Sequence, residues 1–163
     1  MSILDICQWI QDTQIGTQIR ESIWFFPIIE GVHVMTLSVS VGFIYWFDLR
    51  LLGVNMRHQS ISQVRDQVVP WTIVGFVPMV ISGGLLFWAQ AARAYISPFG
   101  KIKFFALIFA ALNILIYHSI TESTITEWDK APVPPMKVRM AGLMSILIWT
   151  VVIAAGRLMA YTF

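Results

Sequence analysis

Four long stretches of the chain contain no Asp, Glu, Lys or Arg, and this feature limits the possible folds more than any other. The stretches are 17 to 26 residues long, and an α-helix needs roughly 17–25 mostly apolar residues to cross the hydrocarbon core of a bilayer. Because backbone groups in lipid must pair within their own segment, we expect each stretch to form a helix. The stretches cover residues 31–47, 67–92, 104–121 and 140–156.

The composition is that of a membrane protein and argues against other classes. Charged residues make up 12% of the 163 residues and hydrophobic residues 57%, whereas soluble domains are about 25% charged. The net charge of +2 and the lack of a basic cluster argue against nucleic-acid binding. The single cysteine, Cys7, excludes an internal disulfide and a thiolate metal cluster.

We therefore predict an all-α fold, a transmembrane four-helix up-down bundle that forms one integral-membrane domain over residues 1–163. Short connections between consecutive helices favour the up-down order. Residues 2–19 carry apolar side chains at helical spacing until Gly16 interrupts the pattern, which predicts a short amphipathic helix at the membrane interface. The expected spans are residues 24–48, 68–93, 102–121 and 138–160.

His33 lies inside the first apolar stretch, where an ionisable side chain is costly and often functional. One interpretation is a hydrogen bond to a neighbouring helix. The other is an axial ligand of haem, since His is the usual ligand of haem iron and bundle cores are common haem sites. A bare metal would need several converging ligands, and the chain has three His in all. This scarcity favours haem b at His33.

His118 closes the third apolar stretch and is the second candidate ligand, although it also fits an interfacial residue beside Tyr117. At about 1.5 Å per residue, the depths of His33 and His118 differ by about 8–14 Å. Two rings that share one haem must lie at nearly the same depth. Two separate sites therefore fit the count better than one shared haem, and two haems would provide an electron path across the bilayer.

The expected surroundings of His33 also suit haem. Gly83 and Gly84 lie at a similar depth and would let a flat ligand approach the backbone, although glycines serve helix packing as often. Basic side chains at the same membrane edge, among them Lys103 and Arg157, are candidates for binding the haem propionates. Their alternative role is ordinary snorkelling to the interface.

The chain contains no motif of a familiar enzyme class. The nucleophile elbow GxSxG, the zinc motif HExxH, the phosphate-binding loop and the GxGxxG fingerprint are all missing. No paired carboxylates lie inside a predicted span. We therefore assign no catalytic residue from the sequence.

The chain contains the segments PIIEGVHV, FDLRLLG, ISGGLLF and KIKFFALIFAALNILIYH. With these segments it resembles an uncharacterised family of small bacterial four-helix membrane proteins, over nearly the whole chain. The resemblance implies a multi-pass protein of the bacterial inner (cytoplasmic) membrane. A more distant likeness, carried by His33, Lys103 and the pair Tyr117-His118, is to HemJ-type protoporphyrinogen oxidases, in which the first-helix His and third-helix Lys are implicated in haem binding. The spacing from Lys103 to Asn113 is similar to that of the CopD copper-resistance membrane domain.

Three functions follow as hypotheses. The first is a b-type haem protein with one or two haems, which passes electrons between quinone or a partner protein and the haem. In it His33 is the principal ligand, and His118 is a second ligand or a second site. The second is a HemJ-like porphyrinogen oxidase, and the third is a non-haem membrane subunit or a CopD-like copper-handling protein. Besides the lipid bilayer, we expect copies of the chain or a larger complex as partners.

Overall fold

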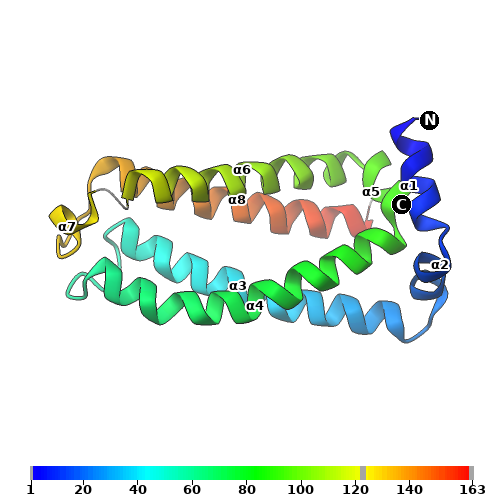
Figure 1. Cartoon of the computed structure of the whole chain (residues 1–163), viewed down its shortest axis with the longest axis horizontal. Coiled ribbons are helices and arrows are strands. Elements are labelled where there is room, and N and C mark those ends of the chain that lie inside the picture. The colour runs from blue at the N-terminus through cyan, green and yellow to red at the C-terminus, as the bar shows by residue number, and fades with distance from the viewer. Residues whose placement is uncertain (1, 122–123, 162–163) are drawn as a thin grey trace.

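The computed structural model describes residues 2–121 and 124–161, and these residues form helices and connecting turns (Figure 1). Four helices are long and apolar enough to cross a membrane, which confirms the predicted all-α fold with four membrane-spanning helices. They are α3 (Phe25–Leu51), α4 (Ile61–Ala89), α6 (Pro98–Thr121) and α8 (Met136–Tyr161). Four short helices accompany them: α1 (Ile3–Gln11), α2 (Gln14–Glu21), α5 (Ala91–Ile96) and α7 (Ile125–Trp128).

The long helices form two antiparallel pairs, α3 with α4 and α6 with α8 (Figure 1). Helix α8 also packs against α3 and joins the pairs. Glycines lie at the contact of α3 with α4 and at the contact of α3 with α8. A Cβ at Gly75 of α4 would lie 2.7 Å from the Ser40 nitrogen of α3, and a Cβ at Gly142 of α8 would lie 3.1 Å from the Asp48 carbonyl oxygen. Backbones can approach this closely only where a side chain is missing.

The N-terminal segment differs from the single helix expected over residues 2–19. Helix α1 ends at Gln11, and α2 starts after Thr13, whose hydroxyl accepts a hydrogen bond from the Gly16 nitrogen. Gly16, which was expected to interrupt the helix, lies inside α2 instead. A Cβ there would lie 2.4 Å from the Gln11 carbonyl oxygen. The glycine therefore permits the tight turn between the two helices rather than ending one of them.

The ends of α4 also differ from the expected span of 68–93. The helix begins at Ile61, because Ser60 and Gln63 form a capping box that satisfies the first backbone N–H groups. It ends at Ala89, where Gln90 leaves the helical conformation at φ −137° and α5 begins. The short helix α5 was not expected from the sequence.

Apolar side chains divide into an inner core and an outer surface. The core between the two pairs includes Val41, Met79 and Trp149, each at most 6% exposed. Outward-facing residues of α6, such as Phe105 and Leu115, are both 63% exposed. An apolar surface of this kind is compatible with contact with the lipid bilayer.

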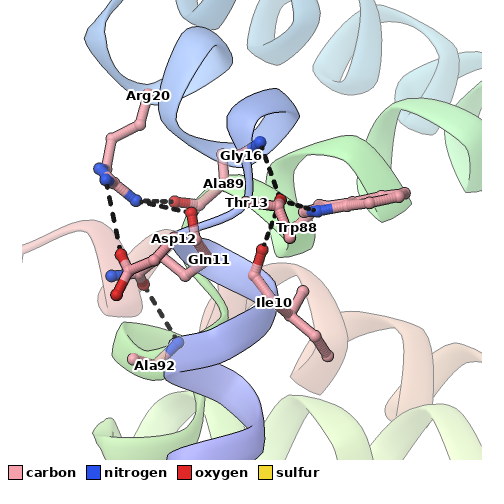
Figure 2. Close-up of polar contacts among 9 residues, drawn as sticks. All are labelled: Ile10, Gln11, Asp12, Thr13, Gly16, Arg20, Trp88, Ala89 and Ala92. Carbon is pink, nitrogen blue, oxygen red and sulfur yellow. Dashed lines mark hydrogen bonds and ion pairs between the residues drawn. The ribbon is translucent and has the colours of Figure 1, made fainter.

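Helices α1 and α2 lie across the end of the bundle where α4 meets α5 (Figure 1). Figure 2 shows the hydrogen bonds that hold them there. Arg20 Nη1 lies 3.1 Å from the Gln11 carbonyl oxygen and 3.4 Å from that of Ala89, and Trp88 Nε1 donates to the Thr13 hydroxyl over 2.8 Å. The N-terminal helices are thus fixed to the C-terminal end of α4.

Candidate functional site

His33 lies eight residues after the start of α3 and is half-buried against α4. Its Nδ1 atom is 3.0 Å from the Met79 carbonyl oxygen and 3.2 Å from the Ser82 hydroxyl. The Met79 carbonyl oxygen can only accept a hydrogen bond. The Ser82 hydroxyl donates its own proton to the Pro78 carbonyl oxygen over 2.6 Å, so toward His33 it also acts as an acceptor. This network assigns the proton of the neutral ring to Nδ1 and leaves the Nε2 lone pair available.

Gly83 provides the space in which the ring sits. A Cβ at this position would lie 2.9 Å from His33 Cε1 and 3.3 Å from Nδ1, whereas a Cβ at Gly84 would meet nothing within 4 Å. The two adjacent glycines therefore face different surroundings. Gly83 lets the imidazole lie flat on α4, and Gly84 faces open space.

Lys103, near the start of α6, belongs to the same end of the molecule. Its ammonium lies within electrostatic range of the His33 ring. The Lys103 side chain extends toward α8, where a Cβ at Gly156 would lie 3.5 Å from Nζ. Within the described part of the chain, Nζ makes no hydrogen bond and no ion pair. Residues of α3, α4, α6 and α8 thus meet around one half-buried imidazole and one half-buried ammonium.

Other basic residues at this end stack on aromatic rings. The Arg157 guanidinium, next to Gly156, lies 5.0 Å from the centre of the Tyr161 ring, and Lys101 Nζ lies 5.4 Å from the centre of the Tyr95 ring. These contacts are typical of cationic side chains beside aromatic faces. They place positive charge on the side of the bundle that carries α1, α2 and α5.

His118 lies far from this group. It is exposed, three residues before the end of α6, and its ring centre is 6.2 Å from that of Tyr117. Helix α6 starts beside α5 and ends beside α7, whereas α3 starts beside α2 (Figure 1). The structure therefore places His33 and His118 toward opposite ends of the bundle and does not bring them together.

Among residues 2–121 and 124–161, no three His, Cys, Asp or Glu side chains converge in a way that could hold a metal ion. A metal at His33 would thus depend on ligands of another kind, such as the nitrogens of a porphyrin. His58, the remaining histidine, lies with Lys130 in a shallow polar pocket at the α7 end.

Two buried charged residues at the α7 end of α3 were not predicted from the sequence. Asp48 is 4% exposed and Arg50 is 0% exposed. The Arg50 Nε and Nη2 atoms donate to the Gln59 carbonyl oxygen over 3.1 and 2.9 Å, and Nη2 also donates to that of Ala131 over 3.1 Å. The signal was the segment FDLRLL, in which two charges stand among apolar residues at a helix end.

Comparisons with known proteins give one match. The model of a family of unknown function matches residues 18–162. No curated protein and no solved structure matches the chain. The likeness to HemJ-type and CopD-type proteins therefore stays a prediction.

Proposed function

Because the chain belongs to the DUF6644 family, a family of unknown function that covers most of its length, we propose its function from its own residues. The protein is a b-type haem protein of the bacterial inner membrane that passes electrons between quinone or a partner protein and the haem. The observation that supports this most is the hydrogen bond from His33 Nδ1 to the Met79 carbonyl oxygen. Metal-binding histidines almost always donate their second ring nitrogen in this way, which fixes the ring and directs the other nitrogen at the metal.

The residues around His33 fit a haem group. The free Nε2 atom would hold the iron, and the Lys103 ammonium lies near the same ring. Arg157 and Lys101 are the basic side chains at this end that would bind the anionic propionates. The haem would supply a redox-active iron. The protein residues would hold it, exclude water from it and set its orientation relative to the bilayer.

Lys103 is the better partner for His33 within one haem site. His118 lies at the other end of α6, so a haem bound there would be a second, separate group. We propose His33 with Lys103 as the principal site and His118 as the candidate for a second one. The localisation in the bacterial inner membrane and the assembly with copies or a redox partner are parts of the same proposal.

The test is an absorption spectrum of the protein purified in detergent, together with a pyridine haemochrome assay. We expect a Soret band that His33→Ala removes. His58→Ala, at a loop histidine outside the site, is the matched control and should leave the band unchanged. His118→Ala should halve the haem content if a second haem exists and leave it unchanged otherwise. Haem-free protein at normal expression, or a band that survives His33→Ala, would overturn the proposal.

A HemJ-like porphyrinogen oxidase is the second candidate, because Lys103 and His33 lie at the same end of the bundle. This function requires haem plus turnover. We expect the chain to rescue growth of a strain that lacks its own porphyrinogen oxidase. The Lys103→Met variant should lose the rescue, and failure of the wild-type chain to rescue would count against this candidate.

A further inference from the structure

A second polar site lies at the opposite end of the bundle from His33, where α8 crosses α3. Asp48, three residues before the end of α3, is 4% exposed. A Cβ at Gly142 of α8 would lie 3.1 Å from the Asp48 carbonyl oxygen and 3.1 Å from Leu51 Cβ. The two helices therefore touch directly beside Asp48 and separate its carboxyl group from water.

Within the part of the chain that the structure describes, the Asp48 carboxyl group has a single hydrogen-bond partner. The Ser145 side chain, three residues beyond Gly142 on α8, hydrogen-bonds to the carboxyl group. The Oδ2 atom is fully enclosed and makes no hydrogen bond to any residue that the structure describes. In water an ionised carboxylate accepts several hydrogen bonds, so an anion here would exchange them for a single neutral one.

Arg50, the nearest cation along the chain, does not compensate an Asp48 anion. Residues two apart on a helix point to different sides. The Arg50 guanidinium donates to the carbonyl oxygens of Gln59 and Ala131, and its charge interacts with Asp129. Arg50 is therefore engaged with the connecting turns, while Asp48 faces α8.

Ionisable side chains on the other elements at this end do not pair with Asp48 either. The ion pairs found in the described part of the chain are Arg20 with Asp12 and Arg65 with Asp66. Among the residues whose positions are described, the carboxyl group thus has one neutral hydrogen-bond partner and no counter-ion. The groups concerned are Arg57 and His58 in the α3–α4 connection, Arg65 and Asp66 of α4, Tyr117 and His118 of α6, Glu127 of α7, Asp129 and Lys130 after α7, and Lys137 and Arg139 of α8.

We propose that Asp48 is a proton-binding site, whose carboxyl group holds a proton at neutral pH while α8 is packed on α3. A neutral acid is the form that suits an enclosed site without a counter-ion. The Ser145 hydroxyl can accept from the acid O–H as well as donate. Carboxyl groups inside spanning segments commonly act as proton carriers. The site is independent of the haem proposal, because Asp48 lies at the other end of the bundle.

A proton is a better ligand for this site than a metal ion. No cluster of three His, Cys, Asp or Glu surrounds Asp48 among the residues with described positions. A metal ion would need several oxygen ligands around it. A single carboxyl group with one hydroxyl partner can bind a proton but provides too few oxygen ligands for a metal ion.

Infrared spectroscopy of the full chain in lipid vesicles tests the proposal. We expect a carbonyl stretch of a protonated carboxyl group at neutral pH, which Asp48→Asn removes, because the amide has the shape of the neutral acid but gives no such band. Asp5→Asn, at an exposed carboxyl group of α1, is the matched control and should leave the band in place. Ser145→Ala should shift the band, because it removes the hydrogen-bond partner.

Three results would overturn the proposal. The first is the absence of the band from the wild-type protein at neutral pH, and the second is its persistence in Asp48→Asn. The third is loss of the band on adding sodium or magnesium ions, which would identify a cation site instead. If Asp48→Asn does not fold, an unshifted band in Ser145→Ala overturns the proposal by itself.

Discussion

The His33 ring lies directly on Gly83, so close that a Cβ at this glycine would be 2.9 Å from His33 Cε1. The neighbouring Gly84 has no atom within 4 Å of its Cβ position. The pair provides a matched comparison in which the same methyl group is added one residue apart. It separates the effect of moving the ring from the effect of changing a glycine in α4.

Gly83→Ala should displace the His33 ring and weaken its hydrogen bond to the Met79 carbonyl oxygen. We expect a destabilisation of about 1–3 kcal/mol, the usual result of overpacking a tight contact. Gly84→Ala should be neutral or stabilise by up to about 1 kcal/mol, since Ala favours helix over Gly. Thermal unfolding in detergent measures both, and equal effects of the two variants would contradict the structure. If haem is bound, only Gly83→Ala should change its spectrum.

Gly75→Ala should disrupt the contact between α3 and α4. Its Cβ would lie 2.7 Å from the Ser40 nitrogen, and backbone atoms cannot move aside as a flexible side chain does. We expect a loss of about 2–3 kcal/mol or more. Gly42→Ala, on α3 with nothing within 4 Å of its Cβ position, is the control and should not destabilise. Denaturation midpoints in a single detergent compare the two.

Arg50→Lys should loosen the turns at the α7 end. A lysine carries the charge but lacks the planar fork that reaches the Gln59 and Ala131 carbonyl oxygens together. We expect a loss of about 2–4 kcal/mol, because buried carbonyl groups lose their donors. Faster trypsin cleavage after Arg57, in the connection between α3 and α4, would report the loosening. In the Arg65→Lys variant, trypsin should cleave after Arg57 at the wild-type rate. The ion pair that Arg65 forms with its neighbour Asp66 lies at an exposed position and contributes little to stability.

Helix α1 should fray in acid through its capping box. The Ser2 backbone N–H donates to the Asp5 carboxylate over 2.6 Å, and this bond, with that of the Ser2 side chain, lowers the pKa of Asp5 below its ordinary 3.8. Because the folded pKa is the lower one, the contribution of Asp5 is complete above the ordinary value and is lost as pH falls through the folded value. Amide exchange of residues 3–11, corrected for its intrinsic pH dependence, should rise only in that acid range.

Asp5→Ala is the control for this pH effect. The variant should show faster exchange of residues 3–11 already at neutral pH and no further transition attributable to the cap in acid. An acid transition that persists unchanged in Asp5→Ala would show that another group controls α1.

The four spans were predictable because a helix in lipid excludes charge over its whole length, and a run without charges is visible in one sequence. The helix ends were less predictable. The capping box of Ser60 and Gln63 starts α4 before Arg65 and Asp66. The first turns of α4 therefore carry charges and lie outside the apolar stretch from which the span was predicted. The first helix ends before Thr13 rather than at Gly16. The Thr13 hydroxyl caps the start of α2, and Gly16, which has no Cβ, leaves room for the Gln11 carbonyl oxygen in the turn.

The surroundings of the candidate sites depend on packing that one sequence does not contain. The difference in membrane depth between His33 and His118 could be predicted by counting residues along their helices. That Met79 and Gly83, rather than other residues of α4, face the ring depends on the register between two helices. Asp48 is the last residue of the expected first span, and nothing in the sequence shows what its side chain faces. Its burial depends on contacts with α8, about a hundred residues further along the chain.

The position of the N-terminal helices has a consequence for how the chain assembles. The Gln11 side chain accepts a hydrogen bond from the Ala92 backbone, and Arg20 reaches the Ala89 carbonyl oxygen, 69 residues downstream. Because α1 and α2 are synthesised before α4 and α5, they lack this binding surface until the second span has been synthesised and inserted. A nascent chain arrested before residue 89 would expose α1 and α2 to proteases, and one arrested after α5 would protect them.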